Sequence, residues 1–146
     1  MSESEPAVSV AFAVSIDDTN IGSFNSCEGL GCEIVMEQRE EGGVNGYVWQ
    51  LPTRITYSNI TLTRPVCADT AKLTAWFASM VNGVERRNAT IKAMTADNEV
   101  VASWALAGVV PVRWKGPSLG TDSAKVATET LEIAHHGFLQ GQGMSR

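Results

Sequence analysis

Hydrophobic and polar positions alternate along much of the chain, a pattern that predicts β-strands. From Val8 to Ile16 an apolar side chain recurs at every second position, with serines and alanines between. The same alternation predicts further strands at residues 33–39, 47–51, 55–64, 88–95, 100–109 and 126–135. We therefore expect a mostly β fold, an antiparallel β-barrel or sandwich of about seven strands.

Turn-forming residues separate the predicted strands. Residues 17–20 read Asp-Asp-Thr-Asn, and residues 96–99 have the composition of a hairpin turn. Pro52 is expected to end the strand at 47–51, because proline has no backbone N–H to donate to a sheet. Residues 111–117 contain two prolines and a glycine and are expected to form a loop.

One segment follows the helical period instead. Its apolar side chains recur at spacings of three and four, at Leu73, Trp76, Phe77 and Met80. Asp69 is a candidate N-cap, and glycine at position 83 offers the left-handed exit that helices favour. A helix with one apolar face has to bury it, so we expect this helix to pack on the outside of the sheet.

The length and composition indicate one domain, spanning residues 1–146. Hydrophobic residues make up 44% of the chain and charged residues 18%, and the formal net charge is −5. A negative charge disfavours binding to phosphates, so no specific nucleic-acid binding is expected. No apolar run approaches the roughly 20 residues of a membrane span, and the N-terminus lacks signal-peptide features. Synthesis and folding in the cytoplasm are expected, without membrane anchoring.

The sequence holds no recognisable catalytic, cofactor-binding or metal-binding motif. His135 and His136 are neighbours, so on a strand they point to opposite faces and cannot easily share a metal. The three cysteines lack a metal-site spacing. We interpret the remaining carboxylates as solvated charges or interface partners: Glu28, Glu40, Glu41, Glu129 and Glu132. No cofactor and no enzymatic activity are expected.

Several predicted strands carry small, mostly uncharged side chains on the face opposite the apolar one. The candidate residues for a lumen or interface face are Asn59, Thr61, Thr63, Thr128, Thr130 and Glu132. Strand faces open to solvent usually carry more charge, partly to prevent edge-to-edge pairing. A face of this kind suits contact with another subunit or the wall of a wet channel, and an ordinary threonine-rich outer surface is the alternative.

The order of these segments resembles the tail-tube protein family of contractile phages and extracellular contractile injection systems. The resemblance is carried by residues 12–16, 22–30, 40–43, 59–64, the helix with Leu73, Trp76 and Phe77, residues 111–117 and residues 129–138. It covers about residues 8–138, and residues 139–146 are expected to form a tail.

The resemblance implies a structural subunit that forms hexameric rings, stacked into a tube around a lumen. Each chain is then expected to contribute strands to a ring-wide barrel, completing with its neighbours a sheet that one chain leaves incomplete. The implied partners are further copies of the chain, a sheath protein, baseplate, spike and cap proteins, and effector cargo. The acidic net charge, repeated around a ring, is expected to keep anionic cargo from adhering to the wall.

The resemblance also implies a ring-stacking loop between the second and third predicted strands. Its residues are Glu37, Arg39, Glu40, Glu41, Gly42, Gly43, Val44, Asn45 and Gly46. Assembly into a phage tail or a phage-tail-like particle follows from the same resemblance, and the sequence leaves open which of the two.

Three alternatives stay open at this stage. The chain could form the tube-initiating layer that joins the tube to the spike and baseplate, which the same resemblance allows. It could be a monomeric β-barrel that binds a small apolar ligand. It could also be an enzyme with a dispersed site, although the sequence has no basic cluster for a phosphate-bearing cofactor.

Overall fold

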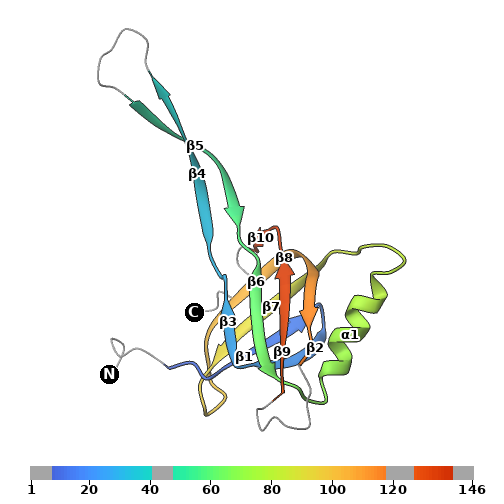
Figure 1. Ribbon diagram of the computed structural model, residues 1–146. Helices are drawn as coiled ribbons and strands as arrows, with labels where there is room; N and C mark the ends of the chain where they lie inside the picture. The colour runs from blue at the N-terminus through green and yellow to red at the C-terminus, as the bar shows by residue number, and fades with distance from the viewer. Residues whose placement is uncertain (1–7, 41–47, 118–126, 140–146) are drawn as a thin grey trace, which may run out of the picture.

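The computed structural model describes residues 8–40, 48–117 and 127–139 of the chain (Figure 1). Its elements are, in order, β1 (Ala11–Ile16), β2 (Thr19–Phe24), β3 (Ser26–Glu28), β4 (Cys32–Glu40), β5 (Val48–Tyr57), β6 (Ile60–Pro65), α1 (Thr70–Ser79), β7 (Arg87–Met94), β8 (Val100–Lys115), β9 (Thr128–Ala134) and β10 (Gly137–Phe138). The prediction of a mostly β fold with one helix is confirmed.

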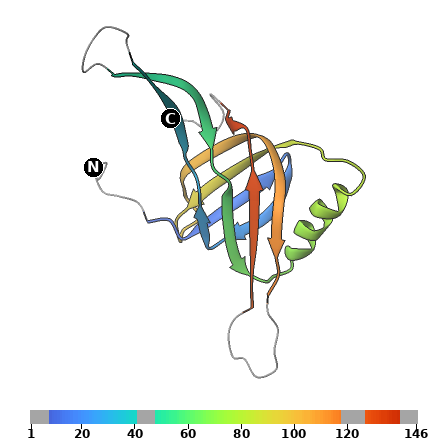
Figure 2. The ribbon, with the colours of Figure 1, turned by 45° about the horizontal axis from the view of Figure 1, so that its top comes forward.

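Most strands form one antiparallel sheet that curls into a barrel. Its order is β2-β1-β7-β8-β9-β6-β3, and β10 adds to β8. The two ends of this order, β2 and β3, are consecutive in the chain and are separated by Asn25 alone. Asn25 N donates to Thr63 O of β6 at 2.8 Å, so the chain passes directly from β2, which pairs with β1, to β3, which pairs with β6. The barrel therefore closes within one chain (Figure 2).

The long strand β8 makes the opposite corner of the barrel. Its residues 100–109 pair with β7, and its residues 110–115 pair with β9. Gly108, with φ +63°, lies beside this change of partner. Strands that bend from one layer into another are a common way to build barrel corners. The expectation that neighbours must complete the sheet is thus wrong for the core, which one chain encloses.

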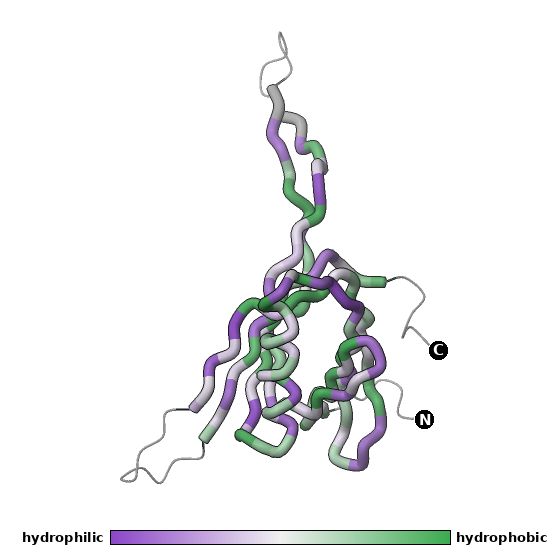
Figure 3. Tube along the Cα trace, turned by 90° about the vertical axis from the view of Figure 1, so that its right-hand side faces the viewer, coloured by the Kyte–Doolittle hydropathy of each residue, from purple (hydrophilic) through white to green (hydrophobic). Residues whose placement is uncertain are grey.

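The inward faces of the barrel strands fill its interior. Hydrophobic and hydrophilic residues alternate along these strands (Figure 3). The buried core residues are Val14, Ile16, Ile21, Phe24, Ile60, Leu62, Leu73, Trp76, Ala89, Ile91, Leu106, Val109, Leu131 and Ile133. The predicted alternation in the first strand is confirmed, with Val14 and Ile16 buried, although the two exposed valines Val8 and Val10 precede it.

Helix α1 covers one side of the barrel next to β2 and β8 (Figure 1). Leu73 and Trp76 are buried, while Phe77 and Met80 pack against the core and are partly exposed. Asp69 occupies the N-cap position, but its side chain makes no capping hydrogen bond. It pairs instead with Lys72 Nζ at 3.1 Å.

Two prolines lie inside strands rather than ending them. β5 continues through Pro52, and β8 continues through Pro111 to Lys115, so residues 111–115 are not the expected loop. A shift in strand register lies beside each proline. Proline is tolerated at such bulges because a residue at a bulge does not need to donate a backbone hydrogen bond to the partner strand.

Other strand boundaries also differ from the prediction. The strand expected at residues 55–64 is two strands, since β5 ends at Tyr57 and β6 begins at Ile60. Strands β2 and β3 were not predicted. The hairpin turn at residues 96–99 is confirmed, and Asn98 has the positive φ (66°) that such turns require.

Strands β4 and β5 form a separate two-stranded hairpin that projects from the barrel (Figure 1). We call this hairpin the arm. At its base the ring of Tyr57 packs against His135 and Phe138, with ring centroids 5.3 and 5.8 Å away. These contacts join the arm to the ends of β9 and β10.

Gly22→Ala is expected to destabilise the barrel. Gly22 has φ +103°, and a Cβ there would collide with Arg64 Nη1 and lie 2.8 Å from Asp69 Oδ2. The backbone strain alone costs about 1–3 kcal/mol. Urea unfolding should show a lower midpoint for this variant. The control is Gly31→Ala, because no atom lies within 4 Å of that position; equal effects of both substitutions would contradict the prediction.

Candidate subunit interfaces

Four strands place the predicted lumen or interface residues on one outward face. β3 pairs with β6, β6 with β9, and β9 with residues 110–115 of β8. In β6 the even-numbered Ile60 and Leu62 are buried, and in β9 the odd-numbered Leu131 and Ile133 are buried, so the residues between them point outward. We call the outward side the hydroxyl face; its residues are Ser26, Glu28, Asn59, Thr61, Thr63, Arg113, Lys115, Thr128, Thr130 and Glu132.

The strand register arranges this face in rows. Thr63 lies between Ser26 and Thr130, and Lys115 follows beyond Thr130. The next row runs through Glu28, Thr61, Glu132 and Arg113 in the same strand order. The predicted residues of β6 and those of β9, which are far apart in the sequence, thus lie on one surface.

The charges on the hydroxyl face are balanced. Two carboxylates, Glu28 and Glu132, accompany two cations, Arg113 and Lys115. Glu132 accepts a hydrogen bond from Asn59 Nδ2 at 2.8 Å and lies 3.9 Å from Arg113 Nε. The chain's net charge of −5 is therefore carried elsewhere than on this face.

Each side of this four-stranded layer ends in a strand without a second partner among the described residues. β3 pairs with β6 on one side only. Residues 110–115 of β8 pair with β9 alone, since β7 and β10 contact the earlier part of β8. Unpaired strand edges are templates for pairing with another chain.

A buried ion pair lies directly behind the hydroxyl face. Arg64 is 2% exposed and Glu129 is fully buried, and Arg64 Nε donates to Glu129 Oε2 at 2.7 Å. Arg64 Nη1 donates to Ile21 O of β2 at 2.7 Å. The guanidinium also lies 4.3 Å from the ring centroid of Phe24. The pair therefore links β6, β9 and β2.

Glu129 has two further donors that connect it to other elements. Thr70 Oγ1, in the first turn of α1, donates to Glu129 Oε2 at 2.8 Å. Trp114 Nε1, near the end of β8, donates to Glu129 Oε1 at 2.8 Å. Both carboxylate oxygens are thus satisfied, as a buried charge requires. The interpretation of Glu129 as a solvated charge or interface partner is wrong.

The hydrogen bonds to Glu129 set its charge state. Burial acts to raise the pKa of Glu129, but the hydrogen bonds from Arg64, Trp114 and Thr70, together with the Arg64 charge, outweigh it. The net effect is a pKa below the ordinary glutamate value. Glu129 is therefore ionised at neutral pH.

The arm carries an exposed apolar surface. Ile34 of β4 lies in register with Ile55 of β5, and Met36 follows two residues later on the same face. Their exposed fractions are 52, 51 and 48%. We call these three residues the arm strip. Large apolar side chains exposed together on a hairpin are typical of a surface that another protein covers.

Only part of the predicted ring-stacking loop lies within the described residues. Glu37, Arg39 and Glu40 belong to strand β4 rather than to a loop. Glu41, Gly42, Gly43, Val44, Asn45 and Gly46 lie outside the described residues. The role of this segment in stacking stays a prediction.

The described residues hold no group of three or more histidine, cysteine or acidic side chains that could bind a metal. His135 is buried, and its Nδ1 accepts the Gly137 N–H at 3.0 Å, whereas His136 is exposed. A Cβ on Gly29 would collide with Asn59 O, so the lack of a side chain at Gly29 allows the backbone at Asn59 to approach closely. Within the same residues, no helix is both long and apolar enough for a membrane span.

Sequence reasoning missed Arg64 and Trp114, although the parity of β6 contained a signal for Arg64. Arg64 follows Ile60 and Leu62 at every second position, on the side that faces the core. Glu129 likewise shares the parity of Leu131 and Ile133. A cation and an anion on two inward faces indicate a buried pair when the strands are neighbours.

Glu129→Gln is expected to destabilise the protein by about 3–5 kcal/mol, because it leaves Arg64 buried without its counter-charge. Urea denaturation followed by tryptophan fluorescence measures this loss. Glu28→Gln is the control, since Glu28 is exposed on the hydroxyl face. A Glu129→Gln midpoint equal to that of the control would refute the structural role of the pair.

The pair also predicts a particular pH dependence. A glutamate whose pKa is lower in the folded than in the unfolded state stabilises the folded protein. This contribution is complete above the unfolded-state pKa of about 4.3 and is lost as the pH falls through the folded-state pKa. The difference in unfolding free energy between wild type and Glu129→Gln should be constant above about pH 5 and shrink below about pH 4. Urea titrations from pH 7 to pH 3 test this, and a difference that grows on acidification contradicts it.

Comparisons with known proteins agree with this architecture. The family model described as "T4-like virus tail tube protein gp19" matches residues 8–139. No curated protein sequence matches the chain. Among solved structures, a chain of the PVC sheath–tube complex of an extracellular contractile injection system, in the extended state, has a TM-score of 0.79 and 24% identity, covering 94% of this chain and 92% of that chain.

Two further structures are similar over most of their length. A chain from the sheath/tube terminator of the PVC system has a TM-score of 0.76 and 26% identity, covering 92% of this chain and 96% of that chain. A chain from the six-fold symmetrised anti-feeding prophage baseplate has a TM-score of 0.74 and 24% identity, covering 92% of this chain and 95% of that chain.

Proposed function

Because the chain belongs to the T4-like virus tail tube protein family, we propose that it forms hexameric rings that stack into the inner tube of a contractile injection system or phage tail. Its role is structural and not enzymatic. Residues 8–139 carry the family match, so nearly the whole chain serves this role.

The observation that carries the proposal is the four-stranded layer, whose outermost strand on each side has one edge without a partner among the described residues. β3 at one edge and residues 110–115 of β8 at the other can each accept a strand of a neighbouring copy. Joining the β3 edge of one copy to the β8 edge of the next uses a different surface on each partner. Such a heterologous contact closes into a ring when the rotation per subunit fits.

The hydroxyl face lines the channel in this arrangement. It is the outward side of the same layer, and α1 covers the barrel elsewhere, next to β2 and β8 (Figure 1). Hydroxyl groups keep water at the wall, and the balanced charges give cargo of either sign no strong attraction. This replaces the expectation of an acidic wall that repels anionic cargo.

The likeness to chains of larger complexes supports specific partners. The similar chains come from complexes with a sheath, a terminator and a baseplate. We therefore infer a sheath protein, baseplate and spike proteins, and a cap as partners, with effector cargo in the lumen. Synthesis in the bacterial cytoplasm followed by assembly into the particle fits these partners.

Two alternatives to the tube subunit differ in their support. A tube-initiating layer remains a second candidate, because the similar chains include one from a baseplate. A monomeric barrel for a small apolar ligand is disfavoured, since Phe24, Leu62, Leu106, Leu131 and other core side chains fill the barrel interior.

The orientation of the hydroxyl face is testable by labelling. Thr130→Cys, in a background where the exposed Cys32 and Cys67 are serines, is labelled with a maleimide-linked gold cluster. Cys27 can stay, because burial and, to a lesser extent, the neighbouring Glu28 raise the pKa of its thiol to about 11 and leave little reactive thiolate. Electron microscopy of assembled rings should place the gold in the central channel.

Ala78→Cys in the same background is the matched control, because Ala78 is an exposed residue of α1. Its gold label should lie at the outer rim. Gold from Thr130→Cys at the rim would overturn the assignment of the channel face. A protein that remains monomeric at high concentration would refute the ring-forming function itself.

A further inference from the structure

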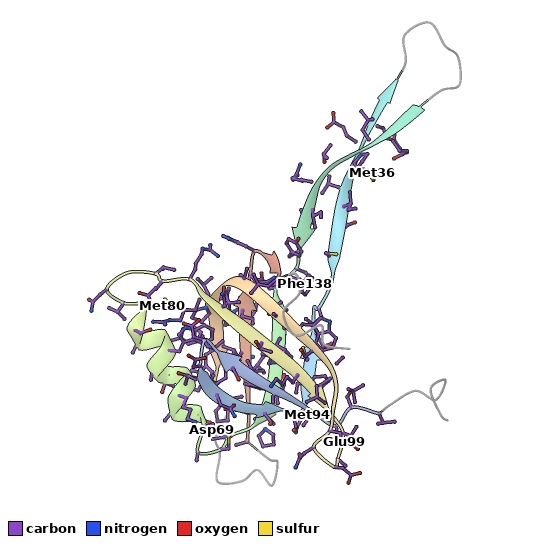
Figure 4. The ribbon with its side chains drawn as sticks, turned by 180° about the vertical axis from the view of Figure 1, so that it is seen from behind. Met36, Asp69, Met80, Met94, Glu99 and Phe138 are labelled. Atoms are coloured by element: carbon purple, nitrogen blue, oxygen red, sulfur yellow. The ribbon has the colours of Figure 1, made fainter. Side chains whose placement is uncertain are left out.

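A buried histidine, His135, lies at the base of the arm between the end of β9 and the short strand β10. It is 7% exposed, whereas its neighbour His136 is exposed. The His135 ring packs against Tyr57 of β5 and Phe138 of β10, with ring centroids 5.3 and 5.5 Å away. Phe138 lies where the arm meets the barrel (Figure 4). Histidine is the side chain whose charge changes most readily near neutral pH, so its place at this junction matters.

The hydrogen bond at His135 requires a neutral imidazole. Gly137 N donates to His135 Nδ1 at 3.0 Å, so Nδ1 carries no proton and the single ring proton is on Nε2. Nε2 is buried and has no hydrogen-bond partner among the described residues. A second proton on the ring would place an N–H against the Gly137 N–H and would add a charge to a buried site. The charged ring therefore does not fit the arrangement around His135.

The turn that His135 holds is also the surface on which the arm packs. Gly137 has φ +131°, and a Cβ there would lie 2.9 Å from Tyr57 Cζ, so the Tyr57 ring lies directly against this turn. Phe138 contacts Tyr57 edge-on and lies in register with Leu106 of β8. Because β10 is only two residues long, the turn before it contributes much of what holds it in place. Loss of the bond between Gly137 and His135 therefore loosens both β10 and the contact of Tyr57 with the barrel.

We propose that His135 is an acid-sensitive latch that fixes the base of the arm to the barrel. With a neutral ring, His135 accepts the Gly137 N–H and holds β10 and Tyr57 in place. When the ring takes up a proton, this hydrogen bond is lost, β10 detaches from β8, and the arm loses its fixed direction. The barrel itself stays closed, because β10 lies off the strand order that closes it. This inference goes beyond the proposed function, since it concerns the response of each subunit to pH.

The positive groups at this corner of the barrel do not favour a proton on His135. His136 is adjacent in the chain and acts to lower the pKa of His135. Arg86 Nη1 donates to Gly108 O of β8 at 2.8 Å, and a Cβ on Gly108 would lie 2.9 Å from His136 Nδ1. A protonated His135 would thus add a positive charge to a corner that already holds a guanidinium.

The carboxylates of the surrounding strands do not compensate. Glu33 of β4 lies in register with Thr56, and therefore on the side of the arm opposite to Tyr57. Glu132 of β9 points outward on the hydroxyl face, whereas His135 has the inward parity of that strand. β10 and the two β8 residues that pair with it carry no titratable side chain. The remaining titratable group in contact with the imidazole is the phenol of Tyr57.

The direction of the pH response follows from these surroundings. Burial lowers the pKa of His135, backbone groups of Gly137 and Ser58 oppose this, and His136 lowers it further, so that the net shift is downward. A histidine whose pKa is lower in the folded than in the unfolded state contributes stability that is complete above the unfolded-state pKa of about 6.5 and is lost as the pH falls toward the folded-state pKa. The latch is therefore closed at neutral pH and opens on acidification. Glu129 does not interfere above about pH 4.5, because its own pKa lies below the ordinary glutamate value.

Hydrogen–deuterium exchange with mass spectrometry measures the latch directly. The protein is labelled at pH values from about 7.5 down to about 4.5, with labelling times scaled to the intrinsic exchange rate at each pH. We expect peptides that contain β10 and the end of β5 at Tyr57 to lose protection as the pH falls, while peptides from β1 and β7 keep theirs. Protection of β10 that is unchanged over the whole range overturns the proposal.

His135→Asn tests whether this ring is the group that takes up the proton. Asparagine Oδ1 can accept the Gly137 N–H but takes up no proton, so the protection of β10 should no longer depend on pH. His136→Asn is the matched control, because it removes the exposed neighbour, and it should lose protection as the wild type does. A His135→Asn protein that still loses β10 protection on acidification overturns the role of His135.

Histidine NMR supplies a second test that leaves His135 unchanged. The chain has two histidines, so protein labelled with carbon-13 at the imidazole Cε1 gives two signals, and His136→Asn assigns them. The His135 signal should titrate below the ordinary pKa of about 6.5, with the same midpoint as the loss of β10 protection. Two different midpoints, or a His135 ring that stays neutral while β10 is released, overturn the proposal.

Discussion

The ion pair between Arg64 and Glu129 is the interaction on which the rest of the structure depends. It is buried behind the hydroxyl face and joins β6, β9, β2, the first turn of α1 and the end of β8. Removing a charge from water costs several kcal/mol, and here that cost is offset by the opposite charge and by the hydrogen bonds to both carboxylate oxygens, although Arg64 Nη2 has no hydrogen-bond partner among the described residues. The pair therefore tolerates few alternative arrangements of the five elements, and it requires glycine at position 22 to leave room for the guanidinium.

This constraint connects the fold to the function. A tube subunit has to transmit force, and each hydrogen bond between strands contributes only about 0.5–1.5 kcal/mol. Many such bonds act together only if the sheet that carries them keeps its shape. By holding β6, β9 and the end of β8 from behind, the Arg64–Glu129 pair fixes the positions of the outward threonines and of the strand edge at residues 110–115. The arm lies outside this network and is joined to the barrel through Tyr57, His135 and Phe138.

The sequence predicted the parts of the fold that follow from local periodicity. The strand alternation up to Ile16, the apolar face of α1 and the turn at residues 96–99 all depend on neighbouring residues. Each appears in the structure, although the first strand begins at Ala11 and not at Val8. The prolines were misjudged, because bulges at Pro52 and Pro111 depend on the partner strand and not on the residue itself. Closure of the barrel within one chain was also missed, because it depends on the pairing of β2 with β1 and of β3 with β6, which local periodicity does not specify. Asn59, Thr61, Thr63, Thr128, Thr130 and Glu132 were selected from two separate segments, and only the register of β6 with β9 brings them onto one face.

The central claim is that copies of this chain join edge to edge through the four-stranded layer, with its hydroxyl side toward a channel. An electron cryomicroscopy reconstruction of the assembled protein, at a resolution that separates strands, tests it most directly. The account predicts that β3 of each subunit lies beside residues 110–115 of its neighbour's β8, and that Thr63 and Thr130 face the axis. Neighbours that meet through β1 or β2 instead, with Thr63 and Thr130 on the outer surface, would contradict it.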